Sequence, residues 1–166
     1  LINHVYQDKR GFIWVSTEDG LNKFDGNKFT IYKQDPNDTG SLAISYVKSV
    51  FEDSKGRFWV LCLNAVQLYE RDTDSFRKVP FELKEGGVMA PRTTMLIERK
   101  NKEIWISTLG QGVMKLENGR FSPIDEINAI IDSHFIEIIY EDQEQNIWIN
   151  TNDKGRFLYS PFTQEV

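Results

Sequence analysis

The sequence predicts an all-β protein built from a repeated four-stranded antiparallel sheet, and three observations support this. The four tryptophans recur at spacings of 45, 46 and 43 residues, a period that is typical of repeat architectures. Each lies between apolar or β-branched neighbours, with turn residues nearby. Aromatic residues make up 13% of the chain, which suits a core of many short strands. The four segments read GFIWVST, GRFWVLC, KEIWIST and QNIWINT.

The repeats match in residue type as well as in spacing when each tryptophan is taken as the origin. Nine residues upstream, every repeat has an aliphatic residue, and six residues upstream three of the four have aspartate. Ten or eleven residues downstream, every repeat has a large apolar residue. This agreement indicates one structural unit repeated four times. In chain order, the positions are Val5, Val50, Leu96 and Ile139, then Asp8, Asp53, Arg99 and Asp142, then Phe24, Tyr69, Leu116 and Tyr159.

The first repeat divides into four short strands, A to D. After strand A, Asp8 can accept a hydrogen bond from the backbone two residues on, and Gly11 can take a positive φ. Strand B carries Trp14, and Asp25-Gly26 before strand D is a strong hairpin pattern. Strand A is expected at Val5–Gln7, strand C at Leu21–Phe24 and strand D at Lys28–Tyr32.

Four antiparallel strands with three tight turns and no helix in each repeat describe a β-propeller blade rather than a solenoid repeat. The predicted fold is therefore all-β, with about four blades that form one partial propeller domain. The connection before the fourth blade places Ile127, Ile130 and Ile131 at helical spacing, which predicts a turn or two of helix. The predicted blades cover residues 1–33, 44–79, 92–124 and 135–166.

Each indole is expected to pack between neighbouring blades. Burying a tryptophan removes about 150–250 Å² from water, worth roughly 4–6 kcal/mol before conformational entropy is subtracted. One repeat departs from the turn pattern, because Arg99-Lys-Asn-Lys replaces Asp-x-x-Gly in the third, so a looser turn is expected there. The predicted structural core residues are Trp14, Trp59, Trp105 and Trp148.

The fourth blade is expected to lack its outer strand. Aligning Tyr69–Phe76 of the second repeat with Tyr159–Val166 places Val166 at the start of strand D. A blade that ends in this way exposes an unpaired strand edge, which favours association with another chain. We therefore expect either self-association, as a homodimer, or a chain boundary that falls within a larger propeller ring.

Composition and motifs exclude several classes of function. The net charge of −5, with lysines and arginines scattered along the chain, argues against nucleic-acid binding. No apolar run approaches the roughly 18 residues that a membrane-spanning helix needs. The single cysteine, Cys62, cannot form an internal disulfide. The histidines His4 and His134 lack metal-ligand spacing, and no nucleophile elbow or phosphate loop is present, so we expect no metal, no cofactor and no catalytic residue.

Candidate ligand-binding residues lie in the loops between strands B and C and in the segments that enter strand A. In a propeller these loops emerge at one face, where ligands commonly bind. Aromatic rings flanked by charged hydrogen-bond donors suit a sugar, particularly an acidic one; ordinary solvated loops are the alternative interpretation. Arg156 occupies a position that is apolar in the other repeats, where it either pairs with a carboxylate between blades or points to the ligand face. The candidates are Tyr46, Arg92, His134, Phe135, Asp153, Lys154 and Arg156.

The pattern V-x-x-V/I-x-x-D-x-x-G-x-x-W-x-x-T, followed by G-L/V-x-x-F/Y, resembles the two-component regulator propeller repeat. It is carried by Ile2–Thr17 with Gly20–Phe24, and by Val47–Val60 with Val66–Tyr69. Members of that family are extracytoplasmic sensor regions of hybrid two-component systems in polysaccharide-degrading bacteria. The resemblance implies a periplasmic segment that binds an oligosaccharide and signals to a histidine kinase further along the parent protein, which regulates transcription. It also implies that the segment meets the membrane only through parts beyond this chain.

Two other functions stay open on the sequence alone. A propeller that serves as a protein-interaction or dimerisation scaffold would expose apolar patches on its blade faces. A propeller lyase or glycosidase would need a carboxylate pair or a His–Tyr pair at the axis, and no such pair is visible by spacing.

Overall fold

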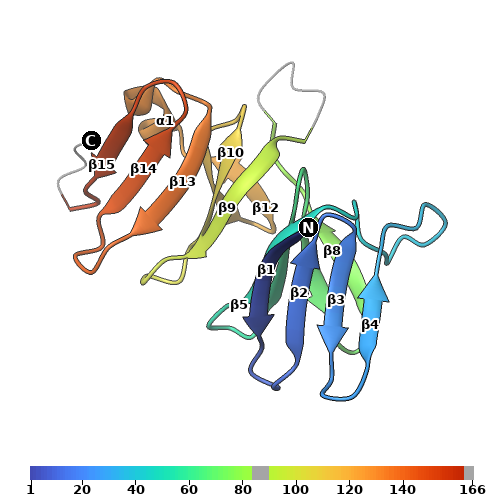
Figure 1. Ribbon diagram of the computed structural model, residues 1–166. Coiled ribbons are helices and arrows are strands. Elements are labelled where there is room, and N and C mark those ends of the chain that lie inside the picture. The colour runs from blue at the N-terminus through green and yellow to red at the C-terminus, as the bar shows by residue number, and fades with distance from the viewer. Residues whose placement is uncertain (84–89, 163–166) are drawn as a thin grey trace. The chain divides into compact units, whose positions relative to one another are not determined.

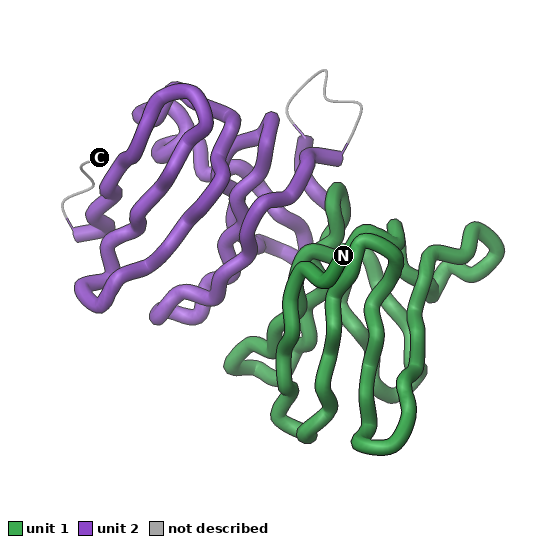
Figure 2. Tube along the Cα trace, viewed as in Figure 1, with its two compact units in different colours: residues 1–79 green, residues 80–166 purple. Residues whose placement is uncertain are grey.

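The computed structural model describes residues 1–83 and 90–162, and these form antiparallel sheets with one short helix (Figure 1). The chain divides into two compact units, Leu1–Val79 and Pro80–Val166 (Figure 2). Each unit contains two sheets in which strands adjacent in sequence are hydrogen-bonded neighbours. The prediction of an all-β fold made of propeller-type blades is confirmed.

Unit 1 contains blades 1 and 2, each a complete four-stranded sheet with its strands in chain order. Within each blade the neighbouring strands are antiparallel, and Trp14 pairs with Tyr6 on one side and with Lys23 on the other. Blade 1 consists of β1 (Ile2–Gln7), β2 (Ile13–Thr17), β3 (Gly20–Phe24) and β4 (Phe29–Tyr32), and blade 2 of β5 (Val47–Glu52), β6 (Phe58–Cys62), β7 (Val66–Glu70) and β8 (Ser75–Val79).

Unit 2 contains blade 3, with four strands, and blade 4, with three strands among the described residues. The expected helix is present as α1 (Asp125–Ile131), which buries Ile127 and Ile131. The predicted start of an outer strand at Val166 lies outside the described residues. Blade 3 consists of β9 (Arg92–Glu98), β10 (Ile104–Leu109), β11 (Val113–Glu117) and β12 (Arg120–Pro123), and blade 4 of β13 (Ile136–Glu141), β14 (Ile147–Thr151) and β15 (Arg156–Tyr159).

A carboxylate accepts a hydrogen bond from the indole of the tryptophan in every blade. In blade 1, Asp8 Oδ2 accepts from Trp14 Nε1 at 2.9 Å, while Asp8 Oδ1 accepts from the amides of Arg10 and Phe12, both at 3.0 Å. Blade 2 repeats this arrangement, with 2.8 Å between Trp59 Nε1 and Asp53 Oδ2. The aspartate therefore closes the A–B turn with one oxygen and orients the tryptophan with the other. The turn was predicted from the sequence; the bond to the indole was not.

Blade 3 keeps the indole bond with a different acid. Arg99 occupies the aspartate position, and Glu103 Oε2 accepts from Trp105 Nε1 at 3.0 Å. The prediction of a looser turn here is wrong, because the turn keeps the bonds Arg99 N to Glu103 O (2.8 Å) and Lys102 N to Arg99 O (2.9 Å). Lys102 takes φ +72° where Gly11 takes +89°, and the side chain of Asn101 accepts from Glu103 N at 3.1 Å.

Three of the four tryptophans are buried, as predicted. Trp14 lies between the two sheets of unit 1, with its ring centroid 4.5 Å from that of Phe58, and Trp59 is 1% exposed. In unit 2, Trp105 packs in one cluster with Ile139 and Ile147 of the neighbouring sheet. In both units the tryptophan face of one blade therefore packs on the opposite face of the next.

The prediction that Trp148 is a core residue is wrong. Its indole donates to Asp142 Oδ2 at 2.9 Å as in the other blades, but 47% of the residue is exposed. The physical reason is that no sheet in the described part of the chain covers the face of β14 that carries this ring. Local sequence fixes the indole bond, whereas burial requires a following blade.

Charged side chains also connect neighbouring blades inside each unit. The guanidinium of Arg71 in blade 2 donates to Asp8 Oδ2 in blade 1 at 2.9 Å and lies 3.5 Å from Glu52 Oε2. In unit 2, Arg99 of blade 3 pairs with Glu141 of blade 4 at 3.1 Å. Burial alone would raise the pKa of Asp8, but hydrogen bonds from Trp14 and Arg71 outweigh burial and hold this pKa below its ordinary value.

Replacing Asp8 by asparagine should lower the free energy of unfolding at neutral pH by about 2–4 kcal/mol, because a buried guanidinium and an indole lose their anionic partner. Since the folded pKa of Asp8 lies below its unfolded value of about 3.9, the carboxylate contributes fully above that pH and loses its contribution as the pH falls through the folded pKa. The difference between wild type and Asp8→Asn should therefore shrink below about pH 4 in urea denaturation followed by circular dichroism. The exposed Asp19→Asn is the control and should cost less than about 1 kcal/mol; an equal loss in both variants contradicts this account.

Truncating two tryptophans that make the same indole bond should separate burial from local bonding. Trp105→Ala should lower the free energy of unfolding by about 3–5 kcal/mol, whereas the half-exposed Trp148→Ala should lower it by about 1–2 kcal/mol. Circular dichroism is the readout, because each variant alters the fluorescence signal itself. Equal losses would show that packing against the next blade contributes little.

Candidate functional site

The loops at one end of unit 2 bring three predicted ligand-binding residues together. Leu109, at the end of β10, pairs with Arg92 on one side and forms a bridge to Phe135 on the other. The carbonyl of His134 accepts from the amides of Gly110 and Gly112 at 2.7 and 3.1 Å. Backbone pairing therefore places Arg92 on one side of Leu109 and the segment His134–Phe135 on the other.

Two further candidates approach this group from the loop between β14 and β15. Asp153 Oδ1 accepts from Ser133 Oγ at 2.5 Å, and Lys154 Nζ lies 3.3 Å from Asp132 Oδ2. The ion pair is largely exposed, so it contributes little stability. These contacts bring five of the predicted residues to one end of unit 2. We call this group the strand-end cluster: Arg92, His134, Phe135, Asp153 and Lys154.

The strand-end cluster offers an aromatic ring and cationic donors. Phe135 is 50% exposed and presents an apolar ring, while Arg92 and Lys154 are exposed cationic donors. Aromatic rings pack against apolar ligand surfaces, and cationic donors bind carboxylates or hydroxyl groups. The arrangement suits a polar ligand with an apolar face.

The remaining two candidates are not part of this group. Tyr46 belongs to unit 1, where it is half-buried and its carbonyl accepts from Leu63 N at 3.0 Å. Arg156 begins β15 opposite Asn150 and is exposed. Arg156 was expected either to pair with a carboxylate between blades or to point to the ligand face. Among the described residues, no carboxylate pairs with it.

The loop between β10 and β11 depends on Asn128, which the sequence did not single out. Asn128 is 3% exposed; its Oδ1 accepts from Val113 N at 2.8 Å and its Nδ2 donates to Val113 O at 2.9 Å. Gly112 lies so close that a β-carbon there would collide with the Asn128 amide. Helix α1 therefore fixes the loop that carries the amide donors to His134.

A threonine three residues after the tryptophan shapes the B–C loop in three blades. Thr17, Thr108 and Thr151 each donate to a carbonyl oxygen within the loop, at 2.8, 2.8 and 2.9 Å. This threonine was visible in the repeat pattern but was not assigned a role. Cys62 stands at this position in blade 2.

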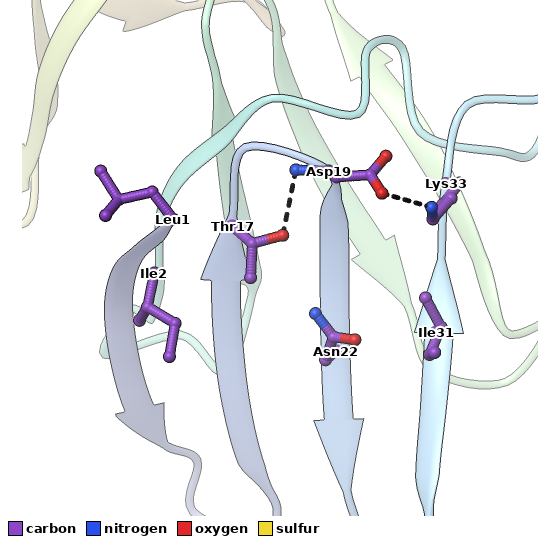
Figure 3. Close-up of a pocket in the computed structure, with 7 residues that line it drawn as sticks. All are labelled: Leu1, Ile2, Thr17, Asp19, Asn22, Ile31 and Lys33. Atoms are coloured by element: carbon purple, nitrogen blue, oxygen red, sulfur yellow. Dashed lines mark hydrogen bonds and ion pairs between the residues drawn. The ribbon is translucent and has the colours of Figure 1, made fainter.

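A hollow lies on blade 1 and has a volume of about 380 Å³ (Figure 3). Its rim is polar, since Lys33 Nζ pairs with Asp19 Oδ2 at 2.6 Å and Asp19 N donates to Thr17 Oγ1 at 3.1 Å. Its apolar wall includes Ile2 and Ile31, which are 63% and 60% exposed. The hollow is part of an exposed apolar sheet face and contains no aromatic side chain.

Two side chains of reactive types, Cys62 and His4, are held in structural roles. Burial raises the pKa of the Cys62 thiol to about 12, so it is not a nucleophile at neutral pH. Burial lowers the pKa of His4, whose Nδ1 accepts from Val50 N at 3.4 Å. Within residues 1–83 and 90–162, no group of three or more His, Cys, Asp or Glu side chains could hold a metal ion. The same residues include no helix with the length and apolar character that crossing a membrane requires.

Gly112→Ala should lower the melting temperature by several degrees, because a side chain at φ +76° is strained and would push Asn128 away from Val113. Gly110→Ala is the matched control. It has φ +113°, but a β-carbon there meets no atom within 4 Å, so it should have the smaller effect. Differential scanning calorimetry measures both, and equal shifts would show that backbone strain, not the asparagine contact, accounts for the loss.

Residues 1–19 match the family model described as a two-component regulator propeller. Histidine kinase P4 of Formosa agariphila is 54% identical over 39 residues, which is 24% of this chain and 3% of that protein. The chain therefore spans a small part of this relative.

Two solved structures from B. thetaiotaomicron are similar over nearly the whole chain. The extracellular domain assigned to the hybrid two-component system BT4673 has a TM-score of 0.81 at 21% identity, over 99% of this chain and 24% of that one. The extracellular domain assigned to the hybrid system BT3049 has a TM-score of 0.69 at 22% identity, over 99% of this chain and 29% of that one. The chain spans less than a third of each. At these identities the likeness shows the fold: the chain carries a two-component regulator propeller repeat and has the propeller fold seen in extracellular domains of hybrid two-component systems.

Proposed function

We propose that this chain is part of an extracytoplasmic, periplasmic propeller that senses a ligand for a hybrid two-component system. The observation that carries this proposal is the match of residues 1–19 to the two-component regulator propeller. The short, strongly similar stretch of a histidine kinase supports it. A sensor needs only different affinities in its two signalling states, so it requires no reactive groups. The signal would pass to a histidine kinase further along the parent protein.

The proposed ligands are oligosaccharides released from polysaccharides. The strand-end cluster supports this class, because Phe135 offers a half-exposed ring next to His134 in the chain, with Arg92 across Leu109. Sugar rings have an apolar face that packs on aromatic side chains and a rim of hydroxyl groups that accept hydrogen bonds. A cationic rim additionally favours sugars that carry a carboxylate.

The alternative function is that of a protein-interaction scaffold, which would use exposed apolar surface on the blade faces. Sensing and scaffolding are compatible, since they use different surfaces of the described chain. A lyase or glycosidase activity has no comparable support, and we assign no reaction to this segment.

The sensing proposal is tested by calorimetric titration of the complete extracytoplasmic region of the parent protein with a panel of neutral and acidic oligosaccharides. At least one should bind, and Phe135→Ala should weaken its binding by at least tenfold, because the aromatic platform is lost. Phe29→Ala, which removes an exposed phenylalanine in unit 1, is the matched control and should bind as wild type does. If no oligosaccharide in the panel binds, the assignment to glycan sensing fails; equal affinity of all three proteins would remove the strand-end cluster from the site.

A further inference from the structure

A hollow of about 280 Å³ lies at the end of blade 2 that carries its A–B and C–D turns. All of its lining residues belong to unit 1, and four of them are arginines. One arginine comes from the A–B turn of blade 1, and the other three come from blade 2. We call this site the arginine hollow; its charged lining residues are Arg10, Arg57, Glu70, Arg71, Asp72 and Arg77.

Two of these guanidinium groups are fixed by carboxylates that do not line the hollow. Arg71 Nη1 lies 2.9 Å from Asp8 Oδ2, and Arg71 Nη2 lies 3.5 Å from Glu52 Oε2. Arg57 Nε lies 2.6 Å from Asp53 Oδ2. The side chains of Asp8 and Asp53 are fully buried, and that of Glu52 is 8% exposed. These acids therefore orient the arginines but are not available to a ligand in the hollow.

Aromatic rings restrict the same two arginines further. The guanidinium carbon of Arg57 lies 5.0 Å from the ring centroid of Trp59, and that of Arg71 lies 5.2 Å from the ring centroid of Phe58. Cation–π contacts and ion pairs together limit the rotamers of a long side chain. A ligand therefore meets donors that are already in place, and this lowers the entropy cost of binding.

Several N–H groups of the lining have no acceptor in the described part of the chain. A guanidinium has five N–H donors. Arg57 uses Nε for Asp53, and Arg77 uses Nε for Glu70 at 2.9 Å, while the Nη groups of both donate to no described residue. Arg10 is exposed, and its side chain forms no hydrogen bond or ion pair with a described residue. The hollow therefore offers planar forks of donors, which match the oxygens of a tetrahedral anion.

The carboxylate of Asp72 narrows the choice of anion. Asp72 is exposed, lines the hollow and pairs with no cation in the described part of the chain. An ionised carboxylate is only an acceptor, so it repels an anion unless that anion carries a proton to donate. Inorganic phosphate carries an O–H group at neutral pH, whereas sulfate does not. The combination of arginines with Asp72 therefore suits phosphate better than sulfate.

We propose that the arginine hollow binds phosphate, with Arg10 and Arg57 donating to its oxygens and Asp72 accepting from its O–H group. The site belongs to unit 1, whereas the strand-end cluster belongs to unit 2. The proposal goes beyond ligand sensing at that cluster and does not depend on it.

Isothermal titration calorimetry of the 166-residue chain with inorganic phosphate and with sulfate, at neutral pH and constant ionic strength, tests the proposal. The wild type should bind phosphate about tenfold more tightly than sulfate. Arg10→Gln should weaken phosphate binding about tenfold, because it removes a charged donor that makes no bond to a described residue. Arg120→Gln, which removes an exposed arginine of β12 in unit 2, is the matched control and should bind phosphate as wild type does.

Asp72→Ala distinguishes recognition of the O–H group from simple attraction between charges. It removes both a negative charge and an acceptor, so sulfate should bind more tightly than to wild type and the preference for phosphate should disappear. Circular dichroism should show that all variants are folded. Absence of phosphate binding at millimolar concentrations overturns the proposal, and so does equal affinity of wild type and a folded Arg10→Gln. A preference for phosphate that persists in Asp72→Ala overturns the role of Asp72.

A titration with glycerol 3-phosphate distinguishes the two sources of a phosphate group. Tighter binding than that of inorganic phosphate, weakened likewise by Arg10→Gln, supports the site and assigns it to a phosphate monoester. Weaker binding supports the site as one for the free ion.

Discussion

The hydrogen bond between a carboxylate and the tryptophan indole is the interaction on which the rest of the structure depends. In blades 1, 2 and 4 the acid follows strand A and also accepts from backbone amides of the A–B turn. One side chain thereby fixes the hairpin and the orientation of the ring. Since the acceptor is an anion and the donor is largely shielded from water in three blades, the bond is stronger than an exposed one. Blade 3 shows that the bond matters more than the residue that makes it, because Glu103 replaces the missing aspartate.

The orientation of the indole gives each blade two different faces, and this difference has structural and functional consequences. One face carries the tryptophan and the other carries small aliphatic or aromatic residues, so blades pack in one direction along the chain. A tryptophan face is therefore buried only where the opposite kind of face of a neighbouring blade covers it. Inside each unit the two kinds of face cover one another, and the loops at the strand ends take no part in this packing of the sheets. The proposed sensing would therefore use loops, whereas the sheet faces serve the packing of the blades.

The sequence predicted the fold well because its main determinants are local and repeated. The tryptophan spacing, the Asp-x-x-Gly turns and the Asp25-Gly26 hairpin specify strands with little help from distant residues, and the strands lie close to where these patterns placed them. The exposure of Trp148 was missed, because its local sequence is like that of the buried tryptophans and only a covering sheet distinguishes it. The regular turn at Arg99 was missed for a related reason: Glu103 and Asn101 supply bonds that no fixed motif describes.

The candidate site stays a prediction, and its geometry could be anticipated less completely than the fold. Loop position alone selected Arg92, His134 and Phe135, whose backbones lie on either side of Leu109. It also grouped them with Tyr46, which belongs to the other compact unit. The role of Asn128 could not be predicted, because no sequence motif marks an asparagine within a seven-residue helix. Its role depends on the loop between β10 and β11, which packs against it. Contacts between segments far apart in sequence determine which residues come together in a site, and a repeat pattern does not specify these contacts.

The most direct test of the central claim is the hydrogen exchange of the four indole N–H groups, followed by nuclear magnetic resonance at neutral pH. The account predicts slow exchange for Trp14, Trp59 and Trp105, whose indoles are both buried and bonded to a carboxylate. Trp148, bonded to Asp142 but 47% exposed, should exchange faster than these three. Rapid exchange at all four indoles would contradict the claim that carboxylate–indole bonds hold the blades together.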